Sequence, residues 1–251
     1  MQLVILTALG VGGATVLGAL LGFLFGNIPH KWNDGILGFA AGVMLAAAVF
    51  GLIQPAVEAV GLAGIWIPTV GILCGALFLN LADKLTPHLH SLTGMDKESH
   101  QNNHSLNRIL LFVMAIAIHN LPEGLAAGVG FGSDDVGNAV AVAVGIALQN
   151  IPEGMVIISP LLLNGVSPGR TFFIASLTGL VEVAGTFIGY FAATVSGTIL
   201  PFMLAFAGGT MLYVISDEMI PETHHDYPRL ATYSLLFGFI VMLVMDTWLG
   251  T

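Results

Sequence analysis

The sequence predicts an all-α protein that crosses a membrane eight times. Hydrophobic residues make up 56% of the 251 residues, only 8% are charged, and the mean hydropathy is +0.91. An ordinary soluble domain has about 25% charged residues. Apolar runs of about 20 residues, the length that crosses a bilayer as a helix, recur along most of the chain. The 32 glycines fit this class, because small residues let membrane helices approach one another closely.

The apolar runs place the predicted helices in order. Three spans come first, and a long polar stretch, residues 83–106, follows as an expected flexible loop. Five more spans follow with short connections. The eight predicted spans are 3–25, 35–56, 61–82, 107–131, 136–163, 169–193, 197–217 and 229–250. We expect residues 1–251 to form a single transmembrane domain.

The basic residues predict the orientation in the membrane. With these spans, all six lie on one side: Lys31, Lys84, Lys97, Arg108, Arg170 and Arg229. Lys and Arg concentrate in cytoplasmic loops, so this side is predicted to be cytoplasmic and both chain ends extracytoplasmic. One span more or fewer would scatter the basic residues over both sides, so the pattern also supports the number eight.

Charge and cysteine content limit the kinds of partner that the protein is expected to bind. The net charge is −9, which is unfavourable for nucleic acid and favourable for cations. The single cysteine, Cys74, excludes a disulfide framework and a cysteine metal cluster. We therefore expect metal cations and the lipid bilayer as partners, and no nucleic acid.

One short pattern occurs twice, thirty residues apart. The fourth span contains H-N-L-P-E-G at 119–124, and the fifth contains Q-N-I-P-E-G at 149–154. These two spans run in opposite directions. Inverted copies of one element are typical of transporters, which place the substrate site between the copies near mid-membrane.

Three glutamates, Glu123, Glu153 and Glu182, lie inside predicted spans. At 1.5 Å per residue, each is near mid-bilayer. Each costs roughly 2.5–3.5 kcal/mol to insert, and none of the six basic residues lies mid-span to neutralise them. A bound cation is therefore the expected counter-charge. His119 and Glu123, like Gln149 and Glu153, are four residues apart, so each pair shares a helix face and can form a two-point clamp.

Asn120 and Asn150 are rotated by about 100° from these clamps, so they can face a second, adjacent metal position. Pro122 and Pro152 kink their helices and free backbone carbonyls. Taken singly, a histidine or asparagine in a span can simply bond neighbouring helices, and a proline can simply bend one. The duplication of the whole pattern favours a metal site.

Together these residues resemble the signature of the Zrt/Irt-like (ZIP) family of divalent-metal transporters. The eight spans and the His-bearing loop between spans 3 and 4 extend the resemblance over the whole chain. It implies a 3+2+3 inverted-repeat arrangement, a binuclear metal centre between the fourth and fifth spans, homodimers, and uptake of zinc toward the cytoplasm. We expect the protein in a bacterial cytoplasmic membrane.

The resemblance also implies roles for single residues. The first metal would be bound by His119, Glu123, Gln149 and Glu153, with Met44, by itself more typical of a core residue, approaching from the second span. The second would be bound by Asn120, Asn150, Glu182 and the bridging Glu123 and Glu153. Asp34, Asp217 and Glu218 match acidic positions of the family's release route. The loop histidines, His88, His90, His100 and His104, are either solvated residues or a weak metal-binding cluster.

Gln149 departs from the family pattern, because many members carry a histidine there. An amide oxygen is a poorer zinc ligand than imidazole, so cadmium, iron(II) and manganese(II) are expected cargoes beside zinc. The alternatives are an intramembrane metallohydrolase, a passive channel and a metal sensor that does not transport. The H-E-x-x-H pattern of metalloproteases does not occur in the sequence, so we expect no enzyme.

Overall fold

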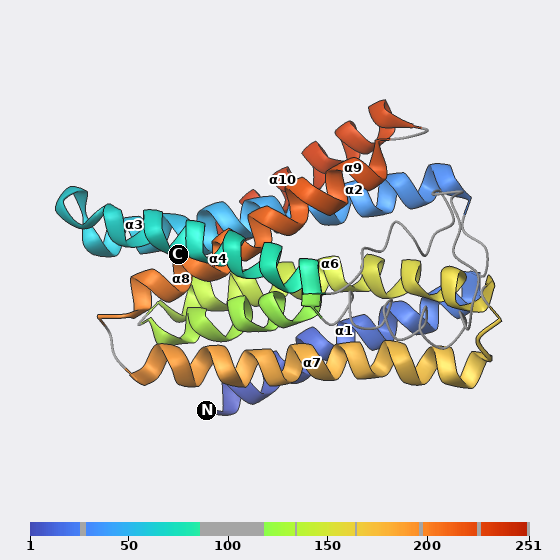
Figure 1. The fold of residues 1–251 in the computed structure, drawn as a ribbon, viewed down its shortest axis with the longest axis horizontal. Helices are drawn as coiled ribbons and strands as arrows, with labels where there is room; N and C mark the ends of the chain where they lie inside the picture. The colour runs from blue at the N-terminus through green and yellow to red at the C-terminus, as the bar shows by residue number, and fades with distance from the viewer. Residues whose placement is uncertain are drawn as a thin grey trace.

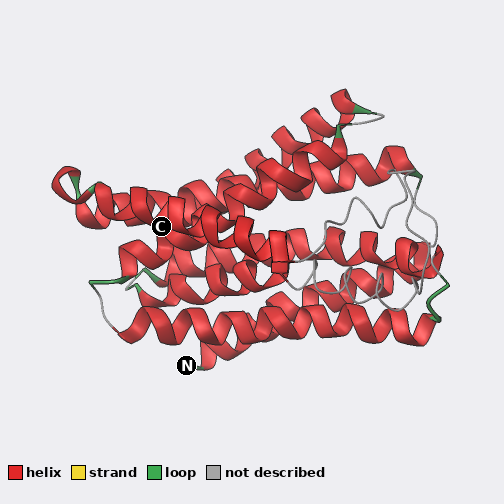
Figure 2. Ribbon diagram, in the orientation of Figure 1, coloured by secondary structure: helices red, strands yellow, loops and turns green. Residues whose placement is uncertain are grey.

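The computed structural model describes residues 1–25, 29–85, 118–133, 135–163, 165–195, 198–224 and 227–249. Within these residues it contains helices and no strand (Figure 2), so the predicted all-α class is confirmed. The α-helices are α1 (Gln2–Phe25), α2 (His30–Ala46), α3 (Gln54–Val60), α4 (Trp66–Leu85), a helix over 118–129, α6 (Val136–Leu163), α7 (Pro168–Val195), α8 (Leu200–Val214), α9 (Ile220–Thr223) and α10 (Pro228–Leu249).

Six helical stretches are long and apolar enough to cross a membrane, and a shorter apolar helix covers Trp66–Ala82. The six stretches are Gln2–Phe25, Lys31–Val60, Val136–Leu163, Pro168–Thr194, Leu200–Thr223 and Pro228–Leu249. The chain is therefore a polytopic membrane protein. The predicted fourth span is described only from residue 118 onward, so the number eight remains a prediction.

Two stretches run beyond their predicted ends, to Val60 and to Thr223. Each contains a π-helical segment shortly before a proline: η1 (Ala47–Ile53) and η5 (Ile215–Met219). Proline usually breaks a helix because it lacks the amide hydrogen that bonds the carbonyl four residues earlier. Before Pro55 that carbonyl, on Gly51, accepts a 3.0 Å hydrogen bond from the Asn138 side chain. The helix therefore continues through the proline.

Consecutive membrane-spanning stretches alternate in direction, and both chain ends lie toward the same end of the bundle (Figure 1). Among the described basic residues, Lys31, Arg170 and Arg229 lie near the starts of α2, α7 and α10, and Lys84 lies at the end of α4. Because the spans alternate, Lys31, Arg170 and Arg229 lie toward the opposite end, whereas α4 runs toward that end and stops partway along the bundle (Figure 1). The orientation in the membrane stays a prediction.

The helices pack through small residues. α1 contacts α6 and α7, α2 contacts α10, and α4 contacts α8, while α6 also contacts α2 and α10. The backbones of α1 and α7 come so close that a Cβ on Gly12 would lie 2.4 Å from the carbonyl oxygen of Gly179. Such close approach is how membrane helices associate in a solvent as apolar as their side chains.

Candidate metal centre

Glu182 of α7 connects the two copies of the repeated motif. Asn120, on the helix over 118–129, donates from Nδ2 to Glu182 Oε1, and Asn150, on α6, donates from Nδ2 to Oε2. All three side chains are buried. The sequence placed these residues at one depth in three spans, and the tertiary structure brings them into direct contact.

The glycine that ends each motif copy allows this contact. A Cβ on Gly124 would lie 2.3 Å from the carbonyl oxygen of Glu182, and a Cβ on Gly154 would lie 2.3 Å from the carbonyl oxygen of Thr15 in α1. Any larger residue would push the motif helices away from α7 and α1. The motif glycines are therefore packing residues, and they set how closely the asparagines approach Glu182.

Sequence reasoning missed Thr15, which donates a 2.6 Å hydrogen bond to Glu182 Oε1. It is 1% exposed, near the middle of α1. The only signal in the sequence was a hydroxyl inside an apolar run, and a threonine in a helix commonly bonds to its own backbone.

Glu123 and Gln149 form the least satisfied part of the centre. Both are buried, and neither carboxylate oxygen of Glu123 nor either side-chain polar atom of Gln149 has a hydrogen-bond partner among the described residues. Gln149 lies beside Glu123, close enough to interact with its charge, but out of hydrogen-bond geometry. Asn150 Oδ1 is likewise buried without a partner. Four unpaired side-chain oxygens therefore belong to three residues of the two motif copies.

The three intramembrane glutamates are close enough for their charges to interact, since the carboxylate of Glu123 senses those of Glu153 and Glu182. No three His, Cys, Asp or Glu side chains of the described residues converge on one point. Any metal site here therefore needs the amide oxygens as well, or a rearrangement of the side chains.

His119 faces an acidic residue of another element. Its Nε2 lies 2.7 Å from Glu218 Oε1, on the π-helical segment η5. Both side chains are about one-fifth exposed, and the charge of Glu153 interacts with both. The sequence assigned Glu218 to a release route apart from the first metal, whereas the structure places it against a predicted ligand of that metal.

The remaining predicted residues are more dispersed. Met44, near the end of α2, is 1% exposed in an apolar cluster that also contains Ala126 and Ile146 of the two motif helices. Asp34 is buried at 6% exposure, and Asp217 is exposed. His88, His90, His100 and His104 lie outside the described residues. The first three residues of the predicted loop, 83–85, continue α4.

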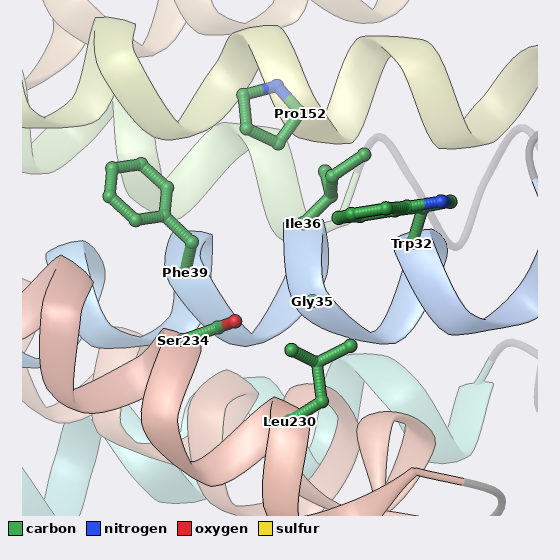
Figure 3. A pocket seen from close by; sticks show the side chains of 7 residues that line it. All are labelled: Trp32, Gly35, Ile36, Phe39, Pro152, Leu230 and Ser234. Carbon is green, nitrogen blue, oxygen red and sulfur yellow. The ribbon is translucent and has the colours of Figure 1, made fainter.

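A cavity of about 260 Å³ lies beside the second motif copy (Figure 3). Its walls are Trp32, Gly35, Ile36 and Phe39 of α2, Pro152 of α6, and Leu230 and Ser234 of α10. Apart from the Ser234 hydroxyl and the indole nitrogen of Trp32, which only donates, these side chains are apolar, so the cavity offers no metal site. The cavity, which Pro152 lines, lies on a different face of α6 from Asn150, because two residues turn a helix by about 200°.

The fold and this buried cluster define a polytopic membrane protein with carboxylates and amides inside its helix bundle. Residues 91–246 match the family model described as ZIP zinc transporter. The chain belongs to this family, as its motifs predicted.

Three bacterial relatives match nearly all of the chain. Zinc transporter GufA of Myxococcus xanthus is 42% identical, with 98% of each chain covered. Zinc transporter ZIPB of Bordetella bronchiseptica is 37% identical over 94% of this chain and 78% of its own. Zinc transporter ZupT of Chlorobaculum parvum is 34% identical over 93% and 92%. With the apolar helices, these relatives assign the protein to the bacterial inner membrane.

Proposed function

We propose that this protein transports divalent metal cations, zinc first among them, into the cytoplasm. The observation that carries the proposal is the set of four buried oxygens on Glu123, Gln149 and Asn150 that have no hydrogen-bond partner among the described residues. Leaving such oxygens unpaired is unfavourable, and bound divalent cations would satisfy them. The relatives, each named a zinc transporter, support zinc as the cargo.

The proposed first metal is bound by His119, Glu123, Gln149, Glu153 and Met44. The proposed second metal is bound by Asn120, Asn150 and Glu182, with Glu123 and Glu153 bridging. This donor set mixes imidazole, carboxylate, amide and thioether, so it also suits Cd²⁺, Fe²⁺ and Mn²⁺. An amide at position 149 weakens zinc binding, which suits a transporter because the ion must also be released.

We further propose that the metal leaves past Asp34, Asp217 and Glu218, that the protein works as a homodimer, and that it catalyses no reaction. The contact of Glu218 with His119 supports the release route, because it joins a predicted ligand to an acidic residue beyond the centre. Against catalysis, the carboxylates that a hydrolase would use as a general base are all proposed metal ligands.

The test is zinc uptake into proteoliposomes that contain Glu123→Ala. We expect uptake to be lost, because the variant removes the two buried oxygens at the centre of the site, while the amount of protein inserted in the membrane stays unchanged. Glu58→Gln, at an exposed position, is the control and should transport normally. Retained uptake by Glu123→Ala would refute the proposed site.

A further inference from the structure

Thr15 differs from other buried threonines of the structure in where its hydroxyl points. Thr178, Thr186 and Thr210 donate to carbonyls of their own helices, as helical threonines commonly do. Thr15 instead donates across the helix interface, from α1 to Glu182 of α7. Since a helical threonine has a local acceptor available, this direction indicates a role for the bond.

Through Glu182 the bond reaches the amide of Asn150. Glu182 accepts from Thr15 and Asn120 at Oε1 and from Asn150 at Oε2, so its carboxylate is held at both oxygens. Asn150 Nδ2 also lies 3.2 Å from the carbonyl oxygen of Val11, one helical turn before Thr15. Both contacts of this Nδ2 therefore depend on α1, directly or through Glu182.

Fixing Nδ2 also fixes the other end of the planar amide. Because the oxygen of an amide lies opposite its nitrogen, the two bonds at Nδ2 turn Asn150 Oδ1 away from Glu182. That oxygen is buried and unpartnered, as are the oxygens of Glu123 and Gln149. The orientation of Asn150 therefore depends on Glu182, which Thr15 anchors.

We propose that Thr15 is a positioning residue for metal binding: it anchors Glu182, which orients Asn150 so that Oδ1 is presented to the cation. Thr15 contacts the carboxylate and not the ion. The inference rests on the proposed transport function. It also assigns Thr15 an effect on selectivity, because amide oxygens favour harder cations, whereas softer ions depend more on imidazole and thioether ligands.

The test compares Thr15→Val, which keeps the shape and removes the donor, with Thr15→Ser, which keeps the donor. Initial uptake rates in proteoliposomes give KM and kcat, and equilibrium binding to the purified protein gives Kd for zinc and cadmium. The loss of one hydrogen bond to a charged group corresponds to a change in KM or Kd of about tenfold. We expect Thr15→Val to raise KM and Kd for zinc about tenfold, to raise those for cadmium less, and to change kcat little. Thr15→Ser should stay near wild type.

Thr178→Val is the matched control, because it removes a buried hydroxyl that bonds only to its own helix. A merely structural loss would reduce the folded fraction and leave KM unchanged. If Thr15→Val elutes as aggregate, Thr15→Ala serves as the second donor-free variant, still compared with Thr15→Ser. In a Glu182→Ala background, Thr15→Val should add nothing, because the effect runs through Glu182.

Unchanged zinc KM in the donor-free variants, failure of Thr15→Ser to restore it, or full additivity with Glu182→Ala would each overturn the role of Thr15. In those cases wild-type uptake keeps the proposed function intact. If the wild-type protein neither binds nor transports a divalent metal, the proposed function fails and this inference with it.

Discussion

His119 Nε2 lies 2.7 Å from Glu218 Oε1, which joins a proposed ligand of the first metal to the acidic π-helical segment η5. A ring nitrogen that is bound to a carboxylate is not available to a metal, whereas the other ring nitrogen still is. In the proposed site Glu218 therefore competes with the metal for Nε2 of His119.

Glu218→Gln tests this competition. The neutral amide should hold His119 less firmly, so zinc should bind more tightly and leave more slowly. A partly exposed ion pair contributes about 0.2–1 kcal/mol, so we expect KM to fall by up to about fivefold, with a lower kcat. Both are read from initial uptake rates, with Glu58→Gln as the control. A raised KM would show that Glu218 helps to bind the metal instead.

Gly124→Ala tests the packing role of the motif glycine. The new Cβ would lie 2.3 Å from the carbonyl oxygen of Glu182, and overpacking of this kind costs about 1–3 kcal/mol. We expect a lower Tm in detergent micelles and reduced zinc uptake. Gly13→Ala is the matched control, because nothing lies within 4 Å of its added Cβ. Equal Tm values for the two variants would contradict the close approach of these helices.

Gln149→His tests the predicted basis of selectivity. Imidazole is a better ligand for zinc than an amide oxygen, and an oxygen ligand suits manganese(II). We expect the variant to lower KM for zinc severalfold and to raise KM for manganese(II). Uptake of the two metals, measured separately over a concentration series, gives the ratio of the KM for zinc to the KM for manganese(II). An unchanged ratio would exclude Gln149 from the metal's ligands.

Asn138→Ala tests how the helix continues through Pro55. The variant leaves the carbonyl oxygen of Gly51 without its 3.0 Å hydrogen bond, and an unsatisfied buried group costs about 1–3 kcal/mol. The midpoint of thermal unfolding should fall accordingly. Gln54→Ala, at an exposed position nearby, should leave it unchanged, and a similar fall in both variants would argue against a specific role for Asn138.

Much of the fold could be predicted because membrane spans leave a local signal. Each apolar run is long enough to identify a helix without reference to any other part of the chain. The boundaries were less predictable where a π-helical segment carries a helix past a proline. The predicted second span stops one residue after Pro55, whereas the helix runs to Val60, and the compensating hydrogen bond to Gly51 comes from Asn138, 87 residues further along the chain. For the same reason the burial of Asp34 could not be deduced from its position at a helix end.

By itself, the sequence determined the helical membrane class, the duplicated motif, the intramembrane carboxylates and the family, since all of these are read from composition and from short spacings. Only the tertiary structure decided which side chains meet. Thr15 and Glu182 are 167 residues apart. His119, on the helix over 118–129, contacts Glu218 on the separate segment η5. Such contacts depend on how closely the helices pack and on how each is rotated about its axis, and neither is encoded in a local stretch of sequence.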